Sequence, residues 1–267
     1  MRGQDWAYAR EDAQGRRFGD ELSRIGYRGS EPVGRRRIHA HYELHIEQGP
    51  ILEVEGKDIG IVTHAQGLYW LQITLIGQEA HSGSTPMPMR RNAGLGAAQI
   101  TDLVHRVAMD YQPDAVGAVG HCDVYPNSRN VIPGRAVFTV DIRSPDLTTL
   151  RAMTRRIEDG AVRIADDLGL GIEIGLAGHF NPVSFDADCI AALRAAADGL
   201  GYSHRDIVSG AGHDACRINQ VAPTAMIMCP CAGGLSHNED EAISRDWAAA
   251  GADVLLHAVL MTAEVVK

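Results

Sequence analysis

Histidine and carboxylate residues alternate in one short segment of the chain. The segment is Glu43-Leu44-His45-Ile46-Glu47, and as a strand it would place Glu43, His45 and Glu47 on one face. Such a face is costly to bury unless a cation such as a metal ion binds to it. A solvent-exposed polar face is the alternative, and the spacing alone favours it.

Two further histidines lie in glycine-rich segments. His237 follows Gly233-Gly234 after an apolar run that predicts a buried strand, and α/β domains bind ligands in such loops. His213 follows a Gly-Ala-Gly run, which lets the backbone approach a ligand closely. An ordinary surface loop is the favoured alternative for His237 and an equal one for His213.

Three polar residues surround a predicted pair of strands. His81 follows a strand and precedes small residues, which indicates a crowded approach. Asn130 and Arg143 bracket the pair, and a guanidinium beside an amide suits a carboxylate because its fork matches two oxygens. Each of the three could instead be structural.

One His-x-Asp motif imitates the spacing of dinuclear zinc sites. His121 and Asp123 form this motif inside a predicted strand, far in sequence from the other candidates. We therefore interpret the motif as unrelated to catalysis.

Composition narrows the classes of function. The chain has 267 residues, a net charge of −9 and a pI of about 5.7, which argues against a nucleic-acid partner. No apolar run approaches the roughly 18 residues that span a bilayer, so no membrane partner is expected. Five scattered cysteines and a polar beginning without a secretory signal favour a cytoplasmic protein.

Hydrophobic patterns predict an α/β fold with an insertion. Strands and helices in the order β-α-β-β-α-β are expected at 67–77, 91–110, 115–125, 135–143, 147–168 and 170–180. This unit should form a four-stranded antiparallel sheet with two helices. Around it we expect a segment at 42–54 that begins as a strand and can open a short helix after its Gly-Pro break. We also expect strands at 58–64 and 224–229 and helices at 186–200 and 246–265, as in an α/β layer domain. Phe18, Leu22 and Ile25 have near-helical spacing.

Several motifs, in this order, resemble those of one enzyme family. The family comprises N-carbamoyl-L-amino-acid hydrolases, β-ureidopropionases and allantoate amidohydrolases, and it is related to dinuclear zinc aminopeptidases and aminoacylases. The motifs are Glu-Leu-His45-Ile-Glu-Gln48-Gly-Pro, Ala-His81-Ser-Gly-Ser-Thr-Pro-Met, Pro-Asn-Ser-Arg-Asn130-Val-Ile-Pro-Gly, Asp141-Ile-Arg143, Ser-Gly-Ala-Gly-His213-Asp214-Ala and Leu-Ser-His237-Asn238.

The resemblance implies an architecture and a metal centre. Residues 1–65 and 183–267 would form a partial zinc-aminopeptidase-like α/β catalytic domain, and residues 66–182 an inserted lid and dimerisation domain. A full-length subunit would hold two divalent metal ions, either zinc, manganese, cobalt or nickel. His45 and His237 would each bind a different ion.

The resemblance also implies how the substrate, an N-carbamoyl amino acid or another ureido acid, is held. Gln48 would contact the substrate, and His81 would reach into the partner subunit's active site across a homodimer. Asn130 and Arg143 would hold the substrate carboxylate, and His213 would sit near the site.

Family members carry an earlier segment with a metal-binding histidine, a bridging aspartate and a Glu-Glu pair that includes the general base. This sequence contains no Glu-Glu dipeptide, so we assign it no catalytic base and predict an N-terminally truncated chain.

Two main hypotheses follow. One is a cytosolic amidohydrolase that releases an amino acid, CO2 and ammonia, with allantoate amidohydrolase and β-ureidopropionase as alternative activities. The other is a non-catalytic dimerising remnant. A peptidase or aminoacylase is a weaker third, because Gln48, Asn130 and Arg143 argue against it.

Overall fold

The computed structural model describes residues 4–31 and 36–263 and divides the chain into two units. The first unit, Met1–His39, contains α1 (Gln4–Tyr8) and α2 (Phe18–Arg24). The helical spacing that begins at Phe18 is therefore confirmed. The second unit, Ala40–Lys267, carries all the candidate site residues. The boundary falls inside the 1–65 segment that the sequence analysis treats as one part.

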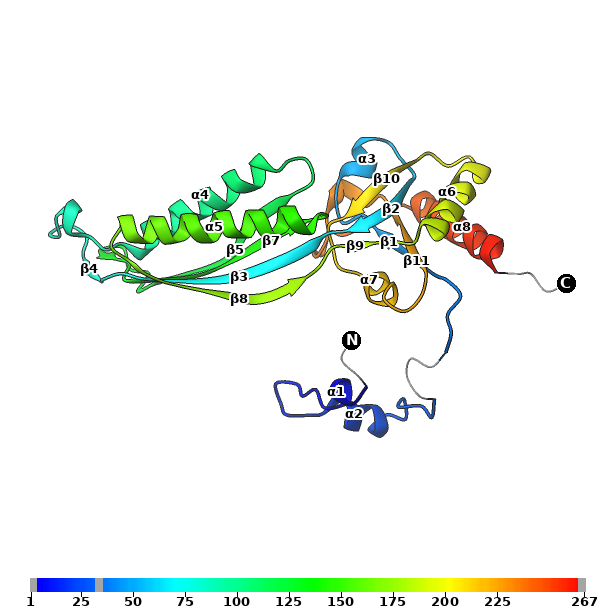
Figure 1. The fold of residues 1–267 in the computed structure, drawn as a ribbon, viewed down its shortest axis with the longest axis horizontal. Helices are drawn as coiled ribbons and strands as arrows, with labels where there is room; N and C mark the ends of the chain where they lie inside the picture. Colours follow the sequence, from blue (N-terminus) through cyan, green and yellow to red (C-terminus); the bar gives the residue numbers. More distant parts are fainter. Residues whose placement is uncertain (1–3, 32–35, 264–267) are drawn as a thin grey trace. The chain divides into compact units, whose positions relative to one another are not determined.

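A five-stranded mixed sheet forms one layer of the second unit (Figure 1). Its main path is β1 (His41–Ile46), β11 (Thr224–Cys229), β2 (Ile59–Ala65) and β10 (His204–Ser209), and β9 (Val183–Ser184) also pairs with β2. β1 runs parallel to β11, and β2 runs antiparallel to β11 and parallel to β10. All six residues of β11 are buried, as expected for a central strand that reads as a continuous apolar run.

Helices cover both faces of this sheet. α6 (Ala187–Leu200) and α8 (Arg245–Thr262) pack on one face around a core that includes Ile59, Ile227 and Val254. The short helices α3 (Ile51–Val54) and α7 (Asp214–Ile218) contribute Leu52 and Cys216 to a second core on the other face. The predicted helices at 186–200 and 246–265 are confirmed within a few residues; residues 264 and 265 lie outside the described part of the chain.

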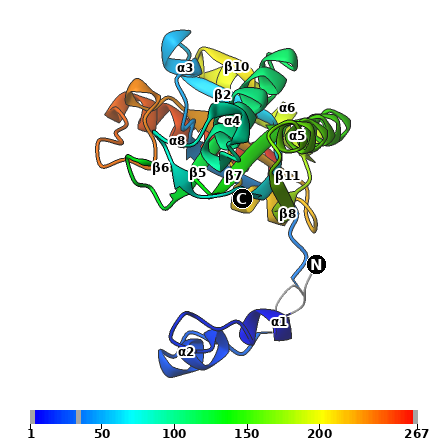
Figure 2. The ribbon, with the colours of Figure 1, turned by 90° about the vertical axis from the view of Figure 1, so that its left-hand side faces the viewer.

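A second, separate sheet contains four antiparallel strands. The order is β5 (Val116–Tyr125), β7 (Arg135–Ser144), β3 (Gly67–Ile76) and β8 (Gly171–Phe180). α4 (Ala93–Asp110) and α5 (Leu147–Asp167) pack together on one face, as Figure 2 shows. Alternate residues of β7, from Ala136 to Ile142, are buried in the core that these helices share with the sheet. The predicted β-α-β-β-α-β arrangement is confirmed.

Several short elements were not predicted. They are β4 (Ala80–His81), which pairs with β6 (Val131–Ile132), the 3-10 turns η1 (Met87–Met89) and η2 (Ala232–Gly234), and also α1, β9, β10 and α7. No helix in the described part of the chain is long and apolar enough to cross a membrane.

The strands of the four-stranded sheet give it two ends. At the near end, beside the five-stranded sheet, Gly67 pairs with Ser144 and Leu68 pairs with Phe180. At the far end, where β4 and β6 lie, Ile76 pairs with Arg135 (Figure 1). The assignment of residues 66–182 to a lid and dimerisation domain stays a prediction.

Candidate active site

His45 lies at the carboxyl end of β1. Its Nδ1 is 2.8 Å from the carbonyl oxygen of Ile46, so this nitrogen carries the proton and Nε2 keeps its free lone pair. Metal-binding histidines are commonly oriented in this way, by donation from one ring nitrogen to a carbonyl. The local geometry therefore suits His45 to bind a metal ion through Nε2.

The carboxylates beside His45 are stabilised by backbone N–H groups. Glu43 Oε2 accepts a hydrogen bond of 2.6 Å from the Ala215 N–H at the start of α7. Glu47 accepts two of 2.8 Å, from the N–H groups of Ile51 and Leu52 at the start of α3. These carboxylates therefore need no cation to offset their burial, because backbone N–H groups at helix N-termini solvate them.

His213 contacts His45 directly. The ring centroids lie 4.6 Å apart at an interplanar angle of 63°. His213 Nε2 is 2.7 Å from the Ser209 hydroxyl, and Nδ1 is 3.8 Å from Glu43 Oε1. Burial lowers the pKa of His213 and the nearby His45 lowers it further, while Glu43 and Asp214 oppose these effects. The neutral imidazole is therefore favoured near neutral pH.

Gln48 contacts the loop that carries His237, next to the same end of β1. The Gln48 amide donates a hydrogen bond of 2.8 Å to the Ser236 hydroxyl, which in turn donates one of 2.8 Å to the Glu241 carboxylate. The Ser236 hydrogen bond lowers the pKa of Glu241, as do the hydrogen bond from the His237 backbone N–H and the electrostatic interactions with the His237 and His45 side chains, while desolvation opposes these effects. His45 and His237 therefore lie around one carboxylate. Gln48 and His237 also have left-handed backbones, with φ of 59° and 57°. Non-glycine residues rarely adopt this conformation, and where they do, the residue is often at a functional site.

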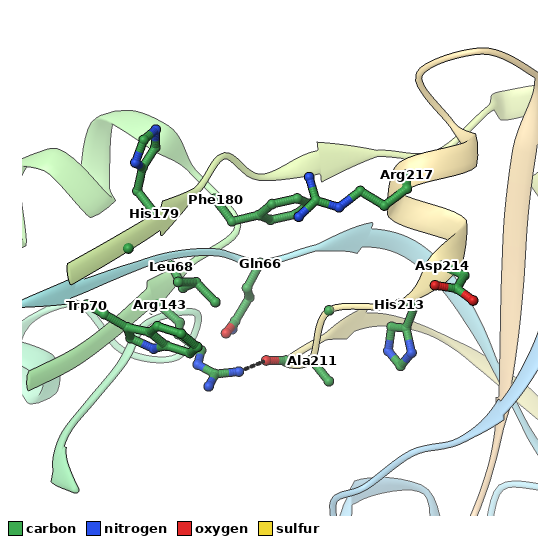
Figure 3. A pocket seen from close by; sticks show the side chains of 13 residues that line it. Gln66, Leu68, Trp70, Arg143, His179, Phe180, Ala211, His213, Asp214 and Arg217 are labelled. Atoms are coloured by element: carbon green, nitrogen blue, oxygen red, sulfur yellow. Dashed lines mark hydrogen bonds between the residues drawn. The ribbon is translucent and has the colours of Figure 1, made fainter. Parts of the chain in front are cut away.

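A pocket of about 450 Å³ lies between the near end of the four-stranded sheet and the segment that leads into α7 (Figure 3). Arg143 lines this pocket. Its Nε donates a hydrogen bond of 3.0 Å and its Nη2 one of 2.7 Å to the Asp141 carboxylate. Its Nη1 donates one of 2.6 Å to the carbonyl oxygen of Gly210. The hydrogen bonds to Asp141 raise the pKa of Arg143. Three of the five guanidinium N–H groups are engaged, and the other two have no partner among the described residues, so they are available to a ligand. His213 lines the same pocket.

His81 and Asn130 lie at the far end of the four-stranded sheet. His81 of β4 pairs with Val131 of β6 in an antiparallel ladder. The backbone N–H of Ser82 donates a hydrogen bond of 3.0 Å to the Asn130 carbonyl oxygen. The turn that holds Asn130 precedes Arg135, the first residue of β7, whereas Arg143 lies near the last. Arg135 and Arg143 are eight residues apart, and about 3.3 Å per residue gives roughly 26 Å.

Asn130 and Arg143 therefore cannot clamp one carboxylate within a single chain. This corrects the simplest form of the predicted clamp. The structure groups Asn130 with His81, while Arg143 lies near His213, His45 and the loop of His237.

The His121–Asp123 motif forms a local ion pair. His121 Nε2 lies 2.8 Å from Asp123 Oδ2, and both side chains are exposed on β5. The geometry agrees with its interpretation as a motif outside the site.

The described residues alone do not form a complete metal site. Within residues 4–31 and 36–263, no three His, Cys, Asp or Glu side chains are grouped closely enough to hold an ion. His45 and His237 fit as single ligands, whereas catalytic zinc usually takes three protein ligands.

Sequence reasoning missed four residues that line the pocket: Gln66, Trp70, Phe180 and Arg217. Three of them lie in or next to predicted strands and were counted only as parts of the fold. The exposed position of Trp70 on β3 was the one available signal, because a large aromatic side chain on an open sheet face often contacts a ligand.

Comparison with known proteins places this chain in a family. The chain belongs to the peptidase family M20/M25/M40, whose model matches residues 13–261. Members of this family are metal-dependent hydrolases.

The chain is similar to the N-carbamoyl-L-amino-acid amidohydrolase of Rhizobium meliloti, with 62% identity over 98% of this chain and 63% of that protein. It is 34% identical to the allantoate amidohydrolase of Escherichia coli, over 86% of this chain and 56% of that protein. A crystal structure of a hydantoinase/carbamoylase family amidase from Burkholderia multivorans matches with a TM-score of 0.94 and 54% identity, over 97% of this chain and 63% of that one. The chain thus spans less than two thirds of these relatives.

Proposed function

We propose that this protein hydrolyses the carbamoyl C–N bond of N-carbamoyl-L-amino acids and releases the amino acid, CO2 and ammonia. One observation carries the proposal: His213 lines the Arg143 pocket and also contacts His45. A carboxylate-binding group is thereby connected to a histidine suited to a metal ion. The likeness to the Rhizobium meliloti amidohydrolase supports the same activity.

The residues of one chain would divide the work of binding. The two free N–H groups of Arg143 would take the α-carboxylate, and Gln48 would contact the substrate from the β1 end. Neutral His213 would hydrogen-bond without adding charge, because its pKa is lowered. His45 and His237 would each bind one of two divalent ions. When such ions are bound, the chemistry they supply is polarisation of the ureido carbonyl and a lowered pKa of a water.

His81 and Asn130 would serve the site of a second copy in a homodimer. His81 Nδ1 lies 3.1 Å from the backbone N–H groups of both Gly83 and Ser84, so it acts as acceptor and Nε2 carries the proton. That N–H is free to donate to a carbonyl oxygen. Because both residues lie at the end of the sheet opposite Arg143, they would complete the partner's pocket, with residues 66–182 acting as lid and dimerisation domain.

The test is ammonia release by the protein expressed from its complete reading frame and loaded with zinc, manganese, cobalt or nickel. We expect turnover of N-carbamoyl-L-amino acids, with allantoate and 3-ureidopropionate as the competing substrates. A faster reaction with either competitor would reassign the substrate. Metal binding without turnover of any ureido acid would favour a non-catalytic protein.

A further inference from the structure

The pocket contains a second guanidinium besides Arg143. Arg217 extends from α7, and its Cζ lies 4.5 Å from the centroid of the Phe180 ring (Figure 3). A guanidinium stacked on an aromatic ring keeps its in-plane N–H groups available for a carboxylate. Phe180 thus holds Arg217 at the pocket in an orientation that suits an anionic ligand.

The two arginines differ in how their charge is balanced. Asp141 neutralises Arg143 through a two-pronged ion pair. Across the described ranges, no carboxylate lies within ion-pair distance of Arg217. Asp214 also lines the pocket, but Figure 3 shows it extending in a different direction from Arg217. Arg217 is therefore the guanidinium whose charge a ligand would balance.

A buried acceptor also faces this space. Gln66 immediately precedes β3, and its Nε2 donates a hydrogen bond of 3.2 Å to the Asp114 carbonyl oxygen. Its Oε1 is buried and accepts no hydrogen bond from any residue that the structure describes. An unpaired buried acceptor is costly, and an N–H group of a ligand would satisfy it.

The pocket thus presents three polar groups that a ligand would have to match, beside an apolar wall. Arg143 offers two donors, Arg217 offers an unbalanced positive charge, and Gln66 offers an acceptor. Leu68 and Trp70 supply apolar surface for methylene groups. The volume of about 450 Å³ lies within the roughly 300–1,000 Å³ of ligand pockets.

We propose that the pocket prefers N-carbamoyl amino acids whose side chain ends in a carboxylate, which Arg217 binds. The α-carboxylate lies at Arg143 and the ureido N–H at Gln66. This inference rests on the proposed function, and it narrows the substrates to the acidic class.

Isothermal titration calorimetry on the 267-residue chain tests the preference with two ligands of nearly equal shape. N-carbamoyl-L-glutamate should bind about five- to tenfold more tightly than N-carbamoyl-L-glutamine, because Arg217 is exposed and its charge is partly screened. Arg217→Gln should remove this difference and leave the Kd of the glutamine ligand unchanged. Arg163→Gln is the matched control, since Arg163 is exposed on α5 and makes no ion pair with any residue that the structure describes.

Equal Kd values for the two ligands in the unchanged chain would overturn the proposal. So would an equal loss of affinity for both ligands in Arg217→Gln, since that would give Arg217 only a structural role. Glutarate and turnover separate this failure from failure of the proposed function. If glutarate binds through Arg217 while neither ureido acid binds, the pocket takes dicarboxylates and the preference for acidic ureido acids is wrong. If none of the three binds, the preference is likewise wrong, whereas the proposed function fails only if the protein from its complete reading frame turns over no ureido acid.

Discussion

The carboxylate of Glu47 distinguishes a structural role from a metal-binding role at the end of β1. Its side chain is 8% exposed, and its two oxygens accept hydrogen bonds of 2.8 Å from Ile51 and Leu52. These bonds fix the start of α3 and close the turn that contains Gln48. We predict that Glu47→Gln destabilises the fold without changing the affinity of the chain for divalent metal ions.

The magnitude follows from the donors that glutamine would face. Its single oxygen can keep one of the two bonds, while its NH2 group meets the other backbone N–H, and neither can accept. The Leu52 N–H is buried, so it would lose a bond to a charged group and stay unsatisfied. Hydrogen bonds to charged groups contribute about 1.5–3 kcal/mol, so we expect a loss of about 2–3 kcal/mol.

Equilibrium urea unfolding measures this loss as a shift of the transition midpoint at constant slope. Glu173→Gln is the control, because the side chain of Glu173 is exposed on β8 and forms no hydrogen bond within the described segments. We expect that control to stay within about 0.5 kcal/mol of the unchanged chain. If Glu47→Gln behaved like the control in urea but weakened zinc binding, the carboxylate would be a metal ligand and our assignment of its role would be wrong.

Five other outcomes are expected. Arg143→Lys should weaken binding of N-carbamoyl-L-methionine at least about tenfold in calorimetry, since an ammonium cannot replace the fork; an unchanged Kd would remove Arg143 from the site. Gly251→Ala should cost about 1–3 kcal/mol in urea, because its Cβ would overlap Cys229 Sγ. Gly199→Ala, with open space around it, should instead stabilise α6 by about 0.5–1 kcal/mol. Native alkylation at pH 8 should label exposed Cys122 first, since burial raises the pKa of Cys229 to about 11 and leaves roughly one thiolate in a thousand; early labelling of Cys229 would contradict the packing. The 267-residue chain alone should release no ammonia from ureido acids, because its described residues group no three metal ligands; ordinary turnover with tightly bound metal would refute this.

Long elements were predictable from local patterns, and short ones were not. Buried residues alternate along β7 with a period of two, and β11 is continuously apolar. In each strand the sequence pattern therefore indicates which residues are buried. In contrast, α7 has only five residues, and Glu43 caps it from 172 positions away. A helix that depends on so distant a partner leaves no signal in its own sequence.

Strand β10 was missed for a related reason. Its first three residues are the polar His204, Arg205 and Asp206, none of which is fully buried. The strand lies at the edge of its sheet and pairs only with β2 on the main path. Because an edge strand needs little apolar surface, its pattern resembles that of a loop.

The candidate site was predictable as a set of residues but not as an arrangement. The motifs located His45, His213 and Arg143 without showing that they converge, since convergence depends on how two sheets meet. The separation of Asn130 from Arg143, in contrast, could have been predicted from the sequence. The predicted strand between them has the length that holds the two residues apart.

That separation has a physical consequence for the proposed homodimer. β7 carries Arg143 of one pocket at its near end, while its far end adjoins the turn with Asn130 that would complete the other pocket. The four-stranded sheet between them has a closely packed core with fully buried Phe138 and Ile142. Packed cores transmit displacements rather than absorb them. A substitution that tilts this sheet should therefore change substrate affinity at both pockets together, even when it lies far from either.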